Sequence, residues 1–292
     1  MLKSGIKRLL RKSARTLRKW AEEPPQPLPD TGPYDAMEVR YTSNPLFVSI
    51  MNKTQWHMYV WPSIQAAKLA KHLGFDRVSF IEFGVAGGHS LLKLEAIAKT
   101  LADYFEINID VYGFDSGTGM PPPRDYRDMP NLWSIGSFGM DVGKLQQRLT
   151  GAQLMLGPVG ERVSSFLQGS PAPVAFAAFD LDYYSSTMEA FRLFDAEHNL
   201  LLPRVHCYFD DILGYSICEF NGELLAITDF NAAHPLRKVA AIRGIRYFVP
   251  ERFANLMWEN YYMLHIFDHN LYACNDGNVG TEMPLDPGWA TK

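Results

Sequence analysis

The sequence predicts one α/β domain built on a doubly wound, mostly parallel sheet that closes with antiparallel strands near the C-terminus. Two patterns carry this prediction. From about residue 55, short apolar runs of strand length alternate with stretches of helical periodicity. A glycine-rich turn at 84–88 also joins the first strong strand to a helix. With 292 residues, 47% of them hydrophobic, the chain is long enough for one such core with short additions.

The individual elements follow from the hydrophobic periodicity. A helix is expected over about 60–73, and the helix after the glycine turn repeats apolar residues at three- and four-residue spacing: Leu91, Leu94, Ala98, Leu101 and Phe105. Strand-like runs occupy 78–83, 109–114, 153–156, 174–179 and 205–209. Further helices are expected near 141–149 and 186–198, the second beginning at the capping-box spacing of Ser186-Thr187-Met188-Glu189.

Both ends of the chain and one internal segment differ from this alternation. Residues 1–23 are predicted to form a basic amphipathic helix, 24–40 a proline-rich linker and 41–292 the folded domain. Within that domain, 116–140 holds four prolines and four glycines without sustained periodicity, which is typical of a lid or a binding loop. The closing antiparallel strands are expected at 243–249 and 261–272.

Charge is divided unevenly along the chain. Residues 1–23 hold eight of the 28 Lys and Arg but only two of the 32 acidic residues, which leaves a body of net charge −10. An acidic body repels phosphate backbones, which argues against nucleic acid as a partner. The segment 1–21 suits peripheral contact with an anionic membrane, and packing on an acidic surface of this chain or of a partner is the alternative.

Cysteine usage and hydropathy indicate the compartment. The three cysteines have no CxxC spacing and an odd count, which favours a reducing environment. No stretch approaches the ~18–20 consecutive apolar residues of a membrane span, and the basic N-terminus lacks the apolar core and cleavage site of a signal peptide. We therefore expect a cytoplasmic protein, with any membrane contact peripheral. Assembly into a homo-oligomer is compatible with these features.

The glycine turn follows a strand that ends in Glu82 and Phe83. It contains Gly84, Val85, Ala86, Gly87 and Gly88, and Ser90 follows at the start of the helix. Glycines permit a tight turn and close approach of backbone N–H groups to a ligand. The spacing GxxGG differs from the GxGxxG of dinucleotide sites, and Glu82 would repel a pyrophosphate but pair with a cationic amino-acid ligand. S-adenosylmethionine is such a ligand, and a plain strand-to-helix connection is the alternative.

Asp115 ends the next strand, within Gly113-Phe114-Asp115-Ser116. A carboxylate at this tip can accept hydrogen bonds from both ribose hydroxyls of an adenosine moiety. Alone, Asp115 would equally suit a turn or helix cap. Together with Glu82 and the glycine turn it favours a nucleoside ligand, for which Ser116 is a further candidate contact.

Two later strands also end in carboxylates. Asp180 and Asp182 follow the run 174–179, and Asp210 and Asp211 follow the run 205–209. In a doubly wound sheet these residues and Asp115 should face one crevice, and the tips of neighbouring strands lie about 4.8 Å apart. Carboxylates that close repel unless one is protonated or a cation lies between them. We predict a Mg²⁺ site formed by Asp180, Asp210 and Asp211; the alternative is that Asp182 and Asp211 cap the segments that follow them.

Four motifs occur in an order that resembles a known family. They are Phe80-Ile81-Glu82-Phe83-Gly84-Val85 with Gly87-Gly88, Gly113-Phe114-Asp115-Ser116 with Gly119-Met120-Pro121, Asp180-Leu181-Asp182-Tyr183-Tyr184-Ser185-Ser186-Thr187, and Asp210-Asp211. Over about residues 75–215 the sequence resembles class I S-adenosylmethionine-dependent methyltransferases, specifically the macrocin and mycinamicin O-methyltransferase type, which modifies antibiotic sugars. The resemblance implies a seven-stranded Rossmann-like methyltransferase fold.

The same resemblance implies roles for individual residues. Glu82 and 84–88 would hold the methionine part of the cofactor, Asp115 the ribose, and Asp180, Asp210 and Asp211 a Mg²⁺ ion. The sequence departs from the family in its basic N-terminus and in its aromatic segment after residue 245. These regions are expected to shape an acceptor pocket, so the antibiotic-sugar substrate is not carried over.

The predicted activity is Mg²⁺-assisted O-methylation of a hydroxyl on a saccharide, a glycan-like molecule or another small-molecule natural product. Asp182 is the candidate catalytic base because it adjoins the metal acids; His206, His89 and reliance on the metal alone are alternatives. A catalytically silent scaffold that docks on a membrane or partner is the main competing function. Three mutually repelling acids argue against it, and GxxGG disfavours an NAD-dependent enzyme.

Overall fold

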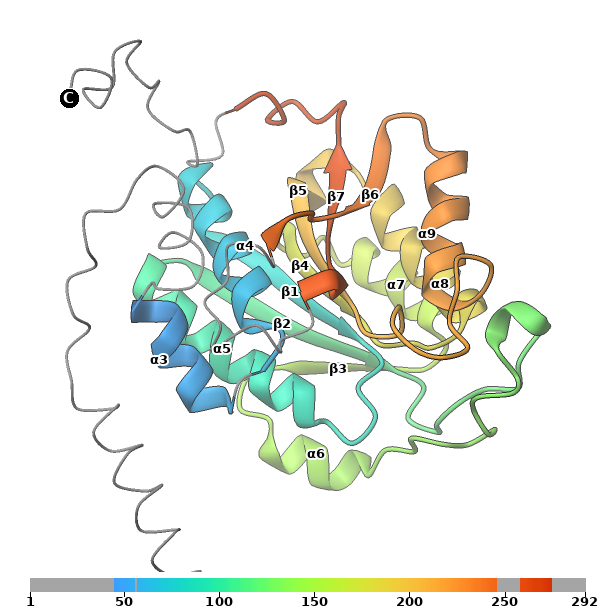
Figure 1. The fold of residues 1–292 in the computed structure, drawn as a ribbon. Helices are drawn as coiled ribbons and strands as arrows, with labels where there is room; N and C mark the ends of the chain where they lie inside the picture. The colour runs from blue at the N-terminus through green and yellow to red at the C-terminus, as the bar shows by residue number, and fades with distance from the viewer. Residues whose placement is uncertain (1–44, 56, 246–257, 275–292) are drawn as a thin grey trace, which may run out of the picture.

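Seven strands form one sheet in the computed structural model, in the order β3-β2-β1-β4-β5-β7-β6 (Figure 1). The structure describes residues 45–55, 57–245 and 258–274. β7 runs antiparallel to both its neighbours, and the remaining neighbouring strands pair in parallel. The strands are β1 Arg77–Phe83, β2 Asn108–Asp115, β3 Gln153–Leu156, β4 Val174–Phe179, β5 Leu201–Phe209, β6 Arg237–Ala241 and β7 Tyr261–Ile266. The doubly wound, mostly parallel sheet predicted from the sequence is confirmed.

Helices cover both faces of the sheet and enclose two hydrophobic clusters (Figure 1). One face packs against α3 Pro45–Thr54, α4 Val60–His72, α5 His89–Phe105 and α6 Val142–Arg148. The other packs against α7 Val159–Gln168, α8 Tyr184–Ala190, the 3₁₀ turn η2 Phe191–Asp195 and α9 Gly222–Ala233. Because the central strand β4 is buried on both faces, its sequence is a continuous apolar run rather than an alternating one.

Four phenylalanines lie side by side at the carboxyl ends of the central strands. The strand register pairs Phe83 with Phe114 and Phe179, and Phe179 with Phe209. The ring centroids of Phe83 and Phe179 are 5.1 Å apart, and those of Phe179 and Phe209 are 4.7 Å apart. All four rings are at least 99% buried. This phenylalanine layer fixes the height of the residue that follows each ring: Gly84, Asp115, Asp180 and Asp210.

The prediction for the antiparallel strands was correct in type but wrong in position. The strand expected at 243–249 lies at 237–241 instead; residues 243–245 are not strand, and 246–249 lie outside the described residues. β6 is an edge strand with Val239 as its one fully buried residue, so it carries little hydrophobic signal. The strand expected at 261–272 ends at Ile266, where the chain turns and the N–H of Phe267 donates to the carbonyl of Leu236.

The helix expected at 186–198 is shorter and begins earlier. α8 spans Tyr184–Ala190 and is followed by the 3₁₀ turns η2 and η3, the latter at His198–Leu200. Ser186 lies inside α8, so the predicted capping box does not form. One backbone donor of the first turn is satisfied from elsewhere in the chain: Oδ1 of Asp128 accepts the N–H of Ser185 at 2.8 Å, and Oδ2 accepts the hydroxyl of Ser185 at 2.8 Å.

Asp128 therefore attaches the 116–140 loop to the end of β4. It lies in the 3₁₀ turn η1, Tyr126–Asp128, is 1% exposed, and also accepts the N–H of Arg124 at 2.8 Å. Asp128→Ala leaves these buried donors without partners, and we expect it to lower the free energy of unfolding by ~2–4 kcal/mol. Urea denaturation with the exposed Asp103→Ala variant as control measures this, and equal midpoints for the two variants would contradict it.

The ends of the chain bear on two further expectations. The predicted basic helix at 1–23 and the proline-rich linker at 24–40 lie outside the described residues, and the first described helix begins at Pro45. Among the described helices, none combines the length and the apolar character needed to cross a bilayer.

Candidate functional site

The site begins at the end of β1 with a fully buried carboxylate. Glu82 has 0% exposure, and its Oε1 accepts a hydrogen bond of 3.0 Å from the hydroxyl of Tyr59, just before α4. Its Oε2 is also buried and has no hydrogen-bond partner among the described residues. Burial raises the pKa of Glu82 well above its usual range, and the charge of Asp180 adds to the rise. An unpartnered buried oxygen of this kind is costly unless a ligand donor reaches it.

The glycine turn after β1 requires its glycines for two different reasons. Gly84 has φ +84°, and a Cβ placed there would lie 1.7 Å from the carbonyl oxygen of Asp180. Gly88 is the N-cap of α5 with φ +80°, and a Cβ there would meet the side chain of Leu145 in α6. The turn therefore lies against the end of β4 in a way that only glycine allows.

The other predicted turn residues lie around the same backbone. Val85 is 4% exposed and Ala86 has φ 45°, so this alanine adopts the left-handed conformation. Gly87 is exposed, and Ser90 is half-buried in the first turn of α5. The structure thus brings the predicted cofactor-contacting backbone together at the start of α5.

Asp115, at the end of β2, holds the glycine turn in place. Its Oδ2 accepts the backbone N–H groups of Val85 and Ala86, each at 2.9 Å, and its Oδ1 accepts that of Gly117 at 2.6 Å. A carboxylate offers about four acceptor positions, so these bonds leave about one. Contact with both ribose hydroxyls therefore requires one of the backbone donors to be released. Ser116 is exposed, and its hydroxyl donates to the carbonyl of Gly119.

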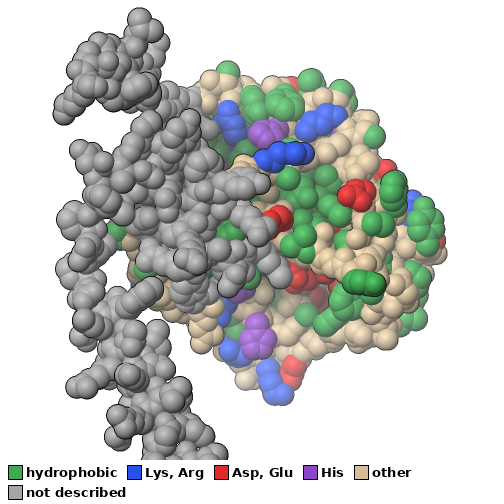
Figure 2. All heavy atoms as spheres, viewed as in Figure 1, with side chains coloured by type: hydrophobic (Ala, Val, Ile, Leu, Met, Phe, Trp, Pro, Cys, Tyr) green, Lys and Arg blue, Asp and Glu red, His purple; other side chains and the backbone are tan. Residues whose placement is uncertain are grey.

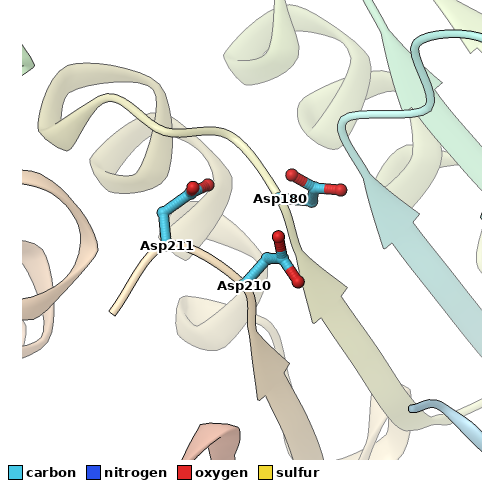
Figure 3. Close-up of side chains that lie close together, drawn as sticks. All are labelled: Asp180, Asp210 and Asp211. Carbon is cyan, nitrogen blue, oxygen red and sulfur yellow. The ribbon is translucent and has the colours of Figure 1, made fainter. Parts of the chain in front are cut away.

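Asp180, Asp210 and Asp211 meet where β4 and β5 end (Figure 3). Each offers a carboxylate oxygen, and these oxygens lie within 4.8 Å of one another. The two strands are neighbours and pair in parallel, which is the condition for their terminal acids to lie close together. Asp210 is exposed, so the cluster opens to solvent on one side, whereas Asp211 is buried.

Burial and mutual repulsion raise the pKa values of Asp180 and Asp211. Burial, and then the charges of Asp210 and Asp211, raise the pKa of Asp180 to about 8. Burial and the charge of Asp210 raise the pKa of Asp211 to about 6. Without a cation, the cluster therefore does not hold three full negative charges at neutral pH.

Asp182 lies next to the cluster, as expected from its position in the sequence. It is 7% exposed with φ 59°, and its backbone N–H donates to Oδ2 of Asp211 at 3.1 Å. Burial and the charge of Asp211 raise the pKa of Asp182 to about 9. Of the alternative bases, His206 is buried in β5 with its ring 6.4 Å from that of Trp61, and His89 is exposed at the start of α5. The catalytic role of Asp182 stays a prediction.

Three residues that the sequence interpretation missed support the site. Tyr59 contacts Glu82, as described above, and packs edge-on against Tyr208 with 5.2 Å between ring centroids. The hydroxyl of Tyr208 donates to Oδ1 of Asp210 at 2.6 Å. Glu223, in the first turn of α9, accepts the backbone N–H of Asp211 at 3.1 Å. Tyr208 precedes Asp210 by two residues on the same strand face, a signal that the sequence did contain.

Comparisons with known proteins identify the fold. No protein-family model and no curated protein matches the sequence. Among solved structures, the calicheamicin methyltransferase CalS11 is similar with a TM-score of 0.50 and 17% identity, over 84% of this chain and 98% of that chain. The O-methyltransferase NovP has a TM-score of 0.43 and 11% identity, over 72% of this chain and 93% of that chain. The narrower macrocin and mycinamicin resemblance stays a prediction. With this strand order, the glycine turn after β1 and the likeness to CalS11, the chain has the class I methyltransferase fold.

Proposed function

We propose that this protein is an S-adenosylmethionine-dependent O-methyltransferase that works with Mg²⁺ on a hydroxyl of a saccharide or another small natural product. The observation that carries the proposal is the convergence of three carboxylates within 4.8 Å at the same end of the sheet as the glycine turn and Glu82. An open α/β sheet binds its ligands at this end.

The residues present suit S-adenosylmethionine. The unpartnered buried oxygen of Glu82 provides an acceptor for the cofactor's ammonium group. The turn at 84–88 leads into the N-terminus of α5, where close backbone approach is possible because Gly84 and Gly88 lack side chains. Asp115 retains about one acceptor position for a ribose hydroxyl.

The acidic cluster suits Mg²⁺. Its donors are carboxylate oxygens, which this cation prefers, and the exposure of Asp210 leaves room for water and acceptor oxygens. The raised pKa values of Asp180 and Asp211 reflect burial and then mutual repulsion, and a divalent cation would offset the repulsion. No step of the chemistry requires these carboxylates to act other than as ligands.

Bound Mg²⁺ would supply Lewis acidity at the acceptor hydroxyl, and S-adenosylmethionine would supply the methyl group. The contribution of the chain is mainly positioning: Glu82 and the glycine turn hold the cofactor, and the acidic cluster orients the acceptor for in-line attack. Asp182 remains our candidate for taking the hydroxyl proton, because it lies beside the cluster, where its backbone N–H donates to Asp211, and a bound cation would favour the ionised form of its carboxyl.

The surface around the cluster supports a small organic acceptor. Figure 2 shows acidic side chains in the middle of this face, bordered by hydrophobic ones. Exposed apolar side chains occur in the 116–140 loop and in the segment between β5 and α9: Tyr126, Ile135, Phe138, Leu213, Tyr215 and Phe220. They provide contact area for the carbon framework of an acceptor whose hydroxyl reaches the acids. The name of CalS11, a calicheamicin methyltransferase, agrees with such an acceptor.

The competing function is a catalytically silent scaffold with the same fold. It would have no need for a buried, unpartnered glutamate oxygen or for repelling carboxylates held together. A cytoplasmic location, membrane contact through 1–21 and homo-oligomer formation are proposed from the sequence alone, and 1–21 lies outside the described residues.

Calorimetric titration of S-adenosylmethionine, with and without Mg²⁺, tests the function. We expect micromolar binding by the wild type, and an affinity about 10–100-fold weaker for Glu82→Ala, because a charge-assisted hydrogen bond is lost. Asp180→Ala should keep cofactor affinity because it leaves Glu82 and the backbone of the glycine turn, the proposed cofactor contacts, unchanged. Glu219→Ala, an exposed carboxylate, is the control. Absence of binding by the wild type under both conditions would leave the scaffold function in its place.

A further inference from the structure

Glu223 connects the two loops that carry the acidic cluster. It lies in the first turn of α9, and its side chain is fully buried. Its Oε1 accepts the backbone N–H of Leu181 at 3.4 Å, and its Oε2 accepts that of Asp211 at 3.1 Å. Leu181 follows β4 and Asp211 follows β5, so each oxygen of one carboxylate holds a different loop.

The two bonded N–H groups belong to the cluster's own backbone. Leu181 lies between Asp180 and Asp182, and Asp211 is a member of the cluster. The same loops are joined a second time, because the N–H of Asp182 donates to Oδ2 of Asp211. Glu223 therefore sets the distance between the two loops, and so between their carboxylates, from the buried side of the cluster.

The chemistry of this position favours a carboxylate over other side chains. Two backbone donors converge on it, and a carboxylate offers two acceptor oxygens with no donor between them. A glutamine would place its NH₂ group against one of the two N–H groups. Glu223 is a buried acid beside the three acids of the cluster and adds repulsion, so its presence needs a compensating function.

We propose that Glu223 is a positioning residue for the Mg²⁺ site, a role that rests on the proposed function. It holds the loops after β4 and β5 at the separation that brings the oxygens of Asp180, Asp210 and Asp211 within reach of one ion. Residues that orient metal ligands without touching the metal commonly alter its affinity by about 10–100-fold.

The test compares Glu223→Gln with Glu219→Gln, which makes the same change on an exposed carboxylate of the preceding loop. Mn²⁺ binding is measured by electron paramagnetic resonance and Mg²⁺ by competition. We expect Glu223→Gln to weaken both metals by about 10–100-fold and Glu219→Gln to leave them unchanged. S-adenosylmethionine affinity without metal, measured by calorimetry, should stay within about threefold of the wild type for both variants, because neither side chain contacts the glycine turn.

The outcomes separate the two proposals. Wild-type protein that binds cofactor and metal, with Glu223→Gln binding metal equally well, overturns the positioning role alone. If Glu223→Gln lowers metal affinity, cofactor affinity and melting temperature together, the role of Glu223 is merely structural. This outcome also overturns the positioning role. Wild-type protein that binds neither metal nor cofactor overturns the proposed function itself. Glu223→Ala is a second variant, and the isosteric glutamine keeps the test valid if the alanine variant does not fold.

Discussion

Gly84→Ala is expected to abolish S-adenosylmethionine binding and to lower the free energy of unfolding by about 3 kcal/mol or more. The new Cβ would lie 1.7 Å from the carbonyl oxygen of Asp180, which is backbone and cannot rotate away. The turn and the end of β4 must therefore separate. The left-handed φ of +84° adds a further ~1–2 kcal/mol for any residue with a side chain. Calorimetry and urea denaturation measure the two effects.

Alanine substitutions at two other glycines separate the effect of the close approach to Asp180 from the effect of the left-handed φ. Gly74 has φ +83°, and a Cβ added there would meet nothing within 4 Å, so Gly74→Ala measures the conformational contribution alone. Gly87 lies in the same turn without a positive φ, and its nearest contact is the side chain of His89 at 3.8 Å, so Gly87→Ala controls for the turn itself. If Gly84→Ala destabilised the protein no more than Gly74→Ala does, the close approach to Asp180 would be refuted.

Asp180→Asn is expected to abolish Mg²⁺ binding and reduce methyl transfer by about 10³-fold, while making the metal-free protein more stable. The first effect follows because one of the three proposed ligands loses its charge. The second follows because the repulsion within the cluster falls. Wild-type stability should rise by about 2.7 kcal/mol at a Mg²⁺ concentration 100 times its dissociation constant, and the variant should show no rise.

The stability of the metal-free protein depends on pH, and this dependence gives the sign of the stabilisation expected from Asp180→Asn. Folding raises the pKa of Asp180 from 3.8 to about 8. Between these values the folded state holds a proton that the unfolded state has released, so stability falls as pH rises through this window. Asp180→Asn should flatten that slope, whereas the exposed Asp103→Asn should not. If Mg²⁺ still stabilised Asp180→Asn, Asp180 would not be part of the Mg²⁺ site.

The sequence predicted those site residues whose positions are set by the ends of the strands. The bounds of β3 and β4 agree with their apolar runs, and the residues after β1, β2, β4 and β5 meet because parallel strands end at one edge. Asp180 and Asp210 could therefore be placed together from sequence alone. The sequence misplaced β6, which has one buried side chain and little hydrophobic periodicity.

Apart from Tyr208, the residues that support the site could not be predicted because they come from distant parts of the chain. Asp128 reaches Ser185 across 57 positions, Tyr59 reaches Glu82 across 23, and Glu223 reaches Leu181 across 42. No local spacing encodes such hydrogen bonds. The capping box predicted at 186–189 was wrong because α8 begins earlier, at Tyr184, and a carboxylate from another loop accepts the N–H of Ser185 in its first turn.

The phenylalanine layer has a consequence for how this protein could diversify. Four adjoining rings set the height of the proposed ligand-binding residues that follow them, so loops of different length can be exchanged beyond these residues without altering that height. A single-residue deletion inside a strand would instead turn its terminal acid to the opposite face. Insertions should therefore be tolerated within 116–140 and between β5 and α9, and rejected within β4. If the proposed function holds, the loops can change which acceptor is bound while the residues at the strand ends keep their positions.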